Sequence, residues 1–189
     1  MQQIQQKINN CNTCGHLPKL TKVSIQIGNT PFIIVGESPA KDGWIQSNTA
    51  FYNTEGKLQA SGKILHKLLQ ILGYSINDIY FTEMCKCIIT DRKQLNVCSN
   101  NCRPFFIEQL QNIPCSIILT MGKFPTQALL QQKIKTFAAI VGKQVPITLN
   151  EKKYTVIPIY HPSPLNPKGY KENVPIFQKL KHLLEEDIY

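Results

Sequence analysis

The chain has 189 residues, which is enough for one domain with one sizeable hydrophobic core. Hydrophobic residues make up 42% and charged residues 17%, which excludes a disordered chain, and no apolar run reaches the roughly 18 residues of a membrane span. The net charge of +9 favours a polyanionic partner such as nucleic acid. Since the N-terminal segment is polar and has no apolar signal core, we expect a cytoplasmic protein, and we expect it to be a monomer.

Segments typical of helices alternate with segments typical of strands along the chain. Apolar residues alternate with polar ones in a half-buried strand, run on continuously in a central strand, and recur every three or four residues in a helix. In chain order, these patterns predict a helix over 2–10, strands over 23–27 and 31–35, a helix over 61–72, a strand over 79–82, a helix over 103–112 that begins near Pro104, a strand over 116–121, a helix over 124–132, a strand over 154–160 and a helix over 174–186.

This alternation predicts an α/β fold in three layers, with a central, mainly parallel four-stranded sheet flanked by helices, in a single domain over 1–189. Ligands of such sheets bind at the carboxyl ends of the strands. Polar or turn-forming residues follow the four central strands, at 36–40, 83, 122–123 and 161–165. The sequence therefore predicts a site where these four segments converge.

Two motifs at these strand ends resemble a known family. GESPA (36–40) resembles the first signature of uracil-DNA glycosylases, and HPSPL (161–165) resembles the second. IYFTEMCKC (79–87), CRPFF (102–106) and LTMGK (119–123) resemble segments of the iron–sulfur branch, family four, so the similarity runs from Cys11 to about Phe177. It implies a DNA glycosylase, which extrudes a base from DNA and cuts the bond to its sugar. No lysine lies in a recognised Schiff-base motif, so we expect a monofunctional enzyme that leaves an abasic site.

The resemblance assigns the chemistry to the two signature motifs. His161 is the expected catalytic residue, donating a hydrogen bond to the pyrimidine O2, which gains negative charge as the glycosidic bond breaks. The best-known branch has a water-activating Asp where this chain has Ser38. Asp42 and Glu37 are the candidates for orienting the attacking water, and the sequence does not choose between them.

The flipped base needs a pocket of its own. By resemblance, Phe51 stacks on the base and Glu83 reads its polar edge. Gly36 and Ser38 belong to the loop that lets the backbone approach the base closely.

The expected DNA contacts lie on the surrounding loops. Ser163 would hold a phosphate, and Leu165 would wedge into the gap that the flipped base leaves in the stack. Pro39, Gly122 and Lys123 complete the expected DNA-binding residues.

Seven cysteines in a chain without a secretion signal favour metal ligation over disulfides. Cys11, Cys14, Cys87 and Cys102 match the cluster ligands of family four, so the resemblance implies a [4Fe–4S] cluster. Their spacing alone fits zinc equally well. If the segment 98–102 is helical, Cys98 shares a face with Cys102 and is an alternative ligand.

One departure from the family bears on the substrate. The family reads uracil with an Asn where this chain has Glu83, and an ionised carboxylate cannot donate to uracil O4. A carboxyl instead suits cytosine, because it accepts from the 4-amino group and shares a proton with N3. The polar segment 51–61 is also longer than the family usually has, which leaves room for a larger base.

Three hypotheses follow. The first is removal of a modified cytosine, such as one in phage DNA, as antiviral defence. The second is ordinary uracil repair, in which a neutral Glu83 imitates Asn. The third is a non-catalytic DNA-binding module, against which the presence of His161 and Phe51 argues.

Overall fold

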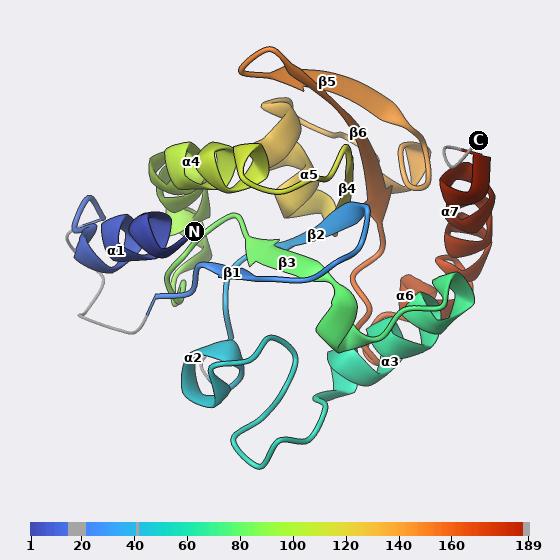
Figure 1. Ribbon diagram of the computed structural model, residues 1–189, viewed down its shortest axis with the longest axis horizontal. Coiled ribbons are helices and arrows are strands. Elements are labelled where there is room, and N and C mark those ends of the chain that lie inside the picture. The colour runs from blue at the N-terminus through green and yellow to red at the C-terminus, as the bar shows by residue number, and fades with distance from the viewer. Residues whose placement is uncertain (15–21, 41, 187–189) are drawn as a thin grey trace.

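The computed structural model describes residues 1–14, 22–40 and 42–186. These residues form a six-stranded sheet in the order β1-β3-β2-β4-β6-β5 (Figure 1). Its centre is the expected parallel set of four: β3 (Tyr80–Glu83), β2 (Phe32–Gly36), β4 (Ile117–Met121) and β6 (Lys152–Ile159). The short edge strands β1 (Ile25–Gln26) and β5 (Val145–Leu149) pair antiparallel with β3 and β6. The α/β fold with a mainly parallel sheet is thus confirmed; the strand predicted over 23–27 is the short edge strand β1, and β5 is added at the other edge.

Helices cover both faces of the sheet (Figure 1). On one face lie α1 (Gln2–Asn10), α4 (Leu95–Gln111) and α5 (Lys123–Leu130). On the other lie α3 (Ala60–Leu69), α6 (Lys168–Lys171) and α7 (Val174–Glu186), and the short α2 (Trp44–Ser47) lies beside the sheet in the connection from β2 to α3. Short 3₁₀ helices occur at Gln70–Leu72, Ile76–Asp78, Arg92–Gln94 and Phe137–Ala139.

The strand residues divide the core between the two faces. Successive side chains of a strand point to opposite faces, so Phe32 and Ile34 of β2 pack towards α3 and α7, whereas Ile33 and Val35 pack towards α4 and α5. All residues of β2, β3 and β4 are buried. Burial on both faces explains why the predictions for these strands were correct to within about one residue.

Helix α4 begins at Leu95, well before the predicted start near Pro104. Its buried residues Leu95, Cys98, Cys102 and Phe106 recur every three or four positions and pack as one stripe. Pro104 lacks an N–H group and cannot donate to the helix, yet the burial of this stripe carries the helix through it. The segment 98–102 is therefore helical, as the alternative role for Cys98 requires.

Strand β5 was not predicted. Its residues are only half-buried or exposed, so they give a weak apolar signal. A hairpin turn at Asn150 and Glu151 joins it to β6, and both residues have positive φ angles, of 45° and 67°. Two successive positive φ angles are typical of a type I′ hairpin turn, which usually carries glycine at its second position.

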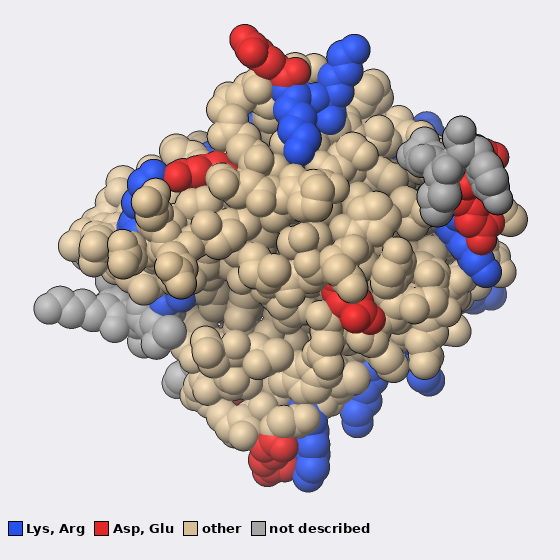
Figure 2. Space-filling model, in the orientation of Figure 1, with Lys and Arg blue, Asp and Glu red and all other residues tan. Residues whose placement is uncertain are grey.

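Charged side chains are spread over the molecular surface. On the face that Figure 2 shows, most Lys and Arg side chains lie towards the edges, and uncharged residues cover most of the middle. The net charge of +9 is therefore not gathered into one basic patch on this face. Among the described residues, no helix has the length and apolar character needed to cross a bilayer.

Candidate active site

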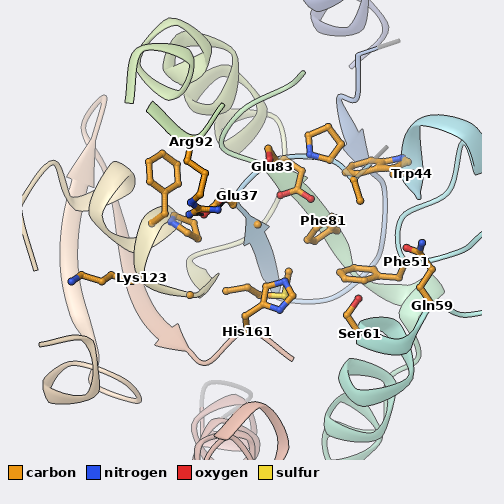
Figure 3. A pocket seen from close by; sticks show the side chains of 18 of the residues that line it. Glu37, Trp44, Phe51, Gln59, Ser61, Phe81, Glu83, Arg92, Lys123 and His161 are labelled. Atoms are coloured by element: carbon orange, nitrogen blue, oxygen red, sulfur yellow. Dashed lines mark hydrogen bonds and ion pairs between the residues drawn. The ribbon is translucent and has the colours of Figure 1, made fainter. Parts of the chain in front are cut away.

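A cavity of about 700 Å³ lies at the carboxyl ends of the four parallel strands (Figure 3). Each strand contributes to its wall, as predicted: Gly36 ends β2, Glu83 ends β3, Gly122 follows β4 and His161 follows β6. Of the residues predicted for the site, those that line the cavity are Gly36, Glu37, Ser38, Pro39, Phe51, Glu83, Gly122, Lys123 and His161. The parallel sheet thus brings together residues that are far apart in the sequence.

Glu83 lies on the wall of the cavity and is 8% exposed. Its Oε2 has no hydrogen-bond partner within the described part of the chain. Burial raises the pKa of this carboxyl to about 8, a shift that nearby Lys86 reduces and Glu37 increases. Glu83 is therefore mostly protonated at neutral pH, so its carboxyl can both donate and accept a hydrogen bond.

Gly36 makes this position of Glu83 possible. A Cβ atom at Gly36 would lie 2.1 Å from Glu83 Oε2, which is inside contact distance. The two residues are direct neighbours across the parallel pair β2 and β3. The glycine of the first motif therefore provides the space that the carboxyl occupies.

Glu37 forms a two-point ion pair with Arg92 at the cavity wall. The Arg92 guanidinium donates to both carboxylate oxygens of Glu37, at 2.9 and 3.1 Å. Arg92 is largely exposed, so the pair contributes little to stability, but a two-point pair fixes the orientation of the carboxylate. No sequence motif indicated Arg92, because the contact joins segments 55 residues apart.

His161 lies at the mouth of the cavity, with its imidazole towards the interior (Figure 3). Its side chain is reached by solvent, yet the surrounding protein lowers its pKa by desolvation, an effect that Glu37 partly opposes. The imidazole is therefore mostly neutral at pH 7 and offers a single N–H donor.

Aromatic rings line the side of the cavity that faces away from the Glu37–Arg92 pair (Figure 3). The Phe51 and Phe81 ring centroids are 4.5 Å apart, and those of Trp44 and Phe81 are 5.3 Å apart. Phe51 has a φ angle of 67°, which is rare for a bulky residue and is typical of functional sites. Phe81 was predicted only as a buried strand residue, and Trp44 was not predicted for the site at all, although it is the only Trp in the chain.

The remaining predicted residues lie around or outside the cavity. The Asp42 side chain is exposed and does not line the cavity; its backbone oxygen accepts from Gln59. Leu165 is 93% exposed, so it is not folded back onto the core. Ser163 Oγ accepts from the backbone N–H of Leu165 within the same loop. Lys123 extends away from the centre of the cavity, and its Nζ donates to the carbonyl of Lys135 (Figure 3).

The cysteines predicted as ligands come from three segments that meet beside the sheet. Cys11 and Cys14 follow α1, Cys87 follows β3 and Cys102 lies on α4. Burial is the main reason that the thiol pKa of Cys87 rises to about 11, and neighbouring Cys102, Cys14 and Cys11 raise it further. Among the residues that the structure describes, no three Cys, His, Asp or Glu side chains are close enough together to hold a metal ion.

Cys98 belongs to the same group of thiols. Burial, followed by the neighbouring Cys14 thiol, raises the pKa of the Cys98 thiol to about 12. The structure thus keeps both Cys98 and Cys102 beside the other thiols, one helical turn apart on α4.

Lys86 is a buried cation between the thiols and the cavity. Its Nζ donates to Thr82 Oγ1, the Glu83 carbonyl and Gln109 Oε1, at 2.6, 2.6 and 2.8 Å. No carboxylate within the described ranges is near enough to pair with it. Its backbone N–H donates to Cys102 Sγ at 3.4 Å. Burial raises the pKa of the Cys102 thiol, and the Lys86 N–H group and cation partly oppose this shift by favouring an anionic sulfur.

Comparison with known proteins identifies a matching family and several relatives of this chain. A model of the uracil DNA glycosylase superfamily matches residues 24–184. The type-4 uracil-DNA glycosylase of Archaeoglobus fulgidus is 26% identical over 188 residues, which cover 95% of this chain and 91% of that protein. The protein of that name from Saccharolobus solfataricus is 28% identical over 197 residues, covering 96% and 85%. The one from Sulfurisphaera tokodaii is 24% identical over 198 residues, covering 97% and 84%.

Proposed function

The chain belongs to the uracil DNA glycosylase superfamily, and we propose that it is a monofunctional DNA glycosylase that removes a cytosine derivative from DNA. DNA glycosylases of this kind hydrolyse the N-glycosidic bond and leave an abasic site. The observation that carries the choice of base is the buried Glu83 carboxyl, whose pKa burial raises to about 8 and whose Oε2 has no hydrogen-bond partner among the described residues.

Glu83 recognises the base by forming two hydrogen bonds with its polar edge. One carboxyl oxygen accepts from the 4-amino group of cytosine, and the protonated oxygen donates to N3. Transfer of this proton to N3 stabilises the negative charge that the leaving base acquires. The rings of Phe51 and Phe81 support the flipped base, and the cavity of about 700 Å³ leaves space for a substituent on C5.

Hydrolysis then requires a hydrogen-bond donor and an activated water. Neutral His161 donates to O2 of the base, where charge builds up as the C1′–N1 bond breaks and its electron pair moves onto the base. Water adds to C1′ and releases one proton to solvent, which balances the proton that Glu83 gives to the base and regains from solvent. Glu37, held by Arg92 at the cavity wall, is better placed than Asp42 to orient this water, because only Glu37 lines the cavity.

The surrounding loops would hold the DNA. Exposed Leu165 fills the gap in the base stack, and Ser163 holds a phosphate. Pro39, Gly122 and Lys123 contact the backbone on either side of the flipped nucleotide. Removal of a modified cytosine from phage DNA would serve antiviral defence.

Ordinary uracil removal is the second candidate, and two observations favour it. The relatives named above are uracil-DNA glycosylases. A protonated Glu83 can also donate to uracil O4 and accept from N3–H.

The deciding experiment is a panel of labelled duplexes containing uracil, cytosine, 5-methylcytosine or 5-hydroxymethylcytosine, read as alkali-cleavable abasic sites. We expect a cytosine derivative to react faster than uracil. Efficient removal of uracil alone would establish the second candidate. Binding to the duplexes without removal of any base would indicate a non-catalytic module.

We also propose that Cys11, Cys14, Cys87 and Cys102 hold a [4Fe–4S] cluster, with zinc as the alternative. Four thiols are the donor set that such a cluster requires, and the buried Lys86 cation beside Cys102 fits an anionic centre. When bound, the cluster would supply cross-linking rather than chemistry at the base. It would join the end of α1, the segment after β3 and helix α4.

A further inference from the structure

The way in which His161 leaves the sheet points to a further residue. Strand β6 ends at Ile159, whose carbonyl still accepts from Gly122 of the neighbouring segment. Tyr160 is the first residue beyond the sheet, so its backbone groups need partners from elsewhere. His161 follows immediately, and its imidazole position depends on the direction that the backbone takes at Tyr160.

Asn173 supplies both partners. Its Oδ1 accepts from the Tyr160 N–H at 3.0 Å, and its Nδ2 donates to the Tyr160 carbonyl at 2.8 Å and to the Gly169 carbonyl at 2.9 Å. Asn173 has no exposed surface. The Asn173 carboxamide thus bonds both backbone groups of Tyr160, as a neighbouring strand would. Its bond to the Gly169 carbonyl links the far end of the loop to the same position.

The loop that follows His161 fixes the backbone on its C-terminal side. The His161 carbonyl accepts from the backbone N–H of Ser163 at 2.8 Å and from Asn166 Nδ2 at 3.1 Å. A Cβ atom at Gly169 would lie 2.6 Å from this carbonyl, so the loop closes tightly behind His161. The backbone is therefore fixed both before and after the imidazole.

We propose that Asn173 is a positioning residue for His161, acting through the backbone of Tyr160. This inference rests on the role of His161 proposed above. An aspartate has nearly the same shape as asparagine but lacks the NH₂ group, so it cannot donate to the two carbonyls. Asn173→Asp therefore removes the two hydrogen bonds that Nδ2 donates with the least change in volume, while an acceptor for the Tyr160 N–H remains.

The test compares Asn173→Asp with wild type in two backgrounds, native and His161→Ala. Single-turnover rates are measured on duplexes containing uracil or 5-hydroxymethylcytosine, together with DNA affinity. With His161 present, Asn173→Asp should slow base removal by roughly 10- to 100-fold, since small displacements of a reacting group have effects of this size. DNA affinity should change by less than about threefold. Without His161, the same substitution should add less than about a threefold loss, because no imidazole remains to be displaced.

The matched control is Asn112→Asp, since the Asn112 amide also donates to a backbone carbonyl, that of Glu108, but at the exposed end of α4. The ¹⁵N signals of the His161 ring, identified by their loss in His161→Gln, should shift in Asn173→Asp and not in the control. If Asn173→Asp fails to fold, Asn166→Ala at the partly exposed loop should cause the same shift with a smaller loss of rate. Equal loss in both backgrounds, or unchanged ring signals, would overturn the proposal. A His161→Ala variant that reacts at the wild-type rate would instead remove the catalytic role of His161, while the ring signals still decide whether Asn173 positions it.

Discussion

We expect the choice between a cytosine derivative and uracil to depend on whether Glu83 can transfer a proton to the base. An amide at this position has a fixed donor and a fixed acceptor, whereas a protonated carboxyl can give its proton away. Glu83→Gln keeps the shape of the side chain and its ability to donate and accept a hydrogen bond, but removes the acidic proton that can be transferred to the base. We therefore expect Glu83→Gln, and the shorter Glu83→Asn, to lower removal of cytosine derivatives relative to uracil by about 1–3 kcal/mol. The duplex panel measures this ratio, and an unchanged ratio would show that Glu83 does not select the base.

The same proton predicts a pH dependence. The pKa of Glu83 is raised to about 8, so the carboxyl is protonated below that pH and loses its proton as the pH rises through it. Single-turnover removal by the wild type should therefore fall as the pH rises above about 8. Glu83→Gln should lack this decline, since its amide does not titrate in this range. A decline that persists in Glu83→Gln would assign the titration to another group.

His161 is expected to act in the transition state rather than in binding. Removal of one donor to a developing oxyanion typically costs about 10² to 10³ in rate. His161→Ala should show a loss of this size in the single-turnover rate with nearly unchanged DNA affinity, measured by fluorescence anisotropy. A parallel loss of affinity would indicate that His161 holds the DNA instead.

The pairing of β2 with β3 fixes where the Glu83 carboxyl lies. Gly36→Ala would place a methyl group 2.1 Å from the present position of Glu83 Oε2, so the carboxyl must move. We expect a loss of base removal of at least about tenfold with the fold retained, as followed by circular dichroism. Gly56→Ala is the control for a glycine-to-alanine change outside the cavity: its Cβ meets no atom within 4 Å, and its φ of 71° means that the change costs stability without touching Glu83. A Gly36→Ala variant with wild-type selectivity would argue against the base-reading role of Glu83.

The elements also show what sequence patterns can and cannot predict. The apolar runs of β2, β3, β4 and β6 define buried strands, and the ends of β2, β3 and β6 place Glu37, Glu83 and His161 on one rim. Strand β5 gives no such signal, because its side chains are partly exposed and its register depends on a hairpin turn without glycine. The Arg92–Glu37 pair was not predictable, because it depends on how two distant loops fold back over the sheet.

For the whole molecule, alternation of strands and helices was enough to predict the layers, since a parallel sheet needs helices on both faces. The additional edge strand β5 does not alter the position of the cavity. The start of α4 at Leu95 matters more, because it places Cys98 beside Cys14 as well as Cys102 beside Cys87. The sequence left open whether Cys98 or Cys102 is a cluster ligand, because their positions relative to the other thiols depend on tertiary packing.

A cluster that joins α1, the segment after β3 and α4 should stabilise the molecule as a whole, because a metal centre bound only in the folded state adds its binding free energy to folding. Protein purified under nitrogen should be brown, absorb at roughly 400 nm as iron–sulfur thiolate centres do, and contain iron. Removal of iron by a chelator should lower the melting temperature.

Cys102→Ala should lose iron and stability, whereas Cys115→Ala, which changes a core thiol bonded to the Thr30 carbonyl, should keep its iron. Cys98→Ala decides the remaining choice: retention of iron assigns the fourth ligand to Cys102, and loss of iron in Cys98→Ala with retention in Cys102→Ala assigns it to Cys98. Zinc without iron in the anoxic protein would contradict the iron–sulfur assignment while leaving the four-thiolate site in place.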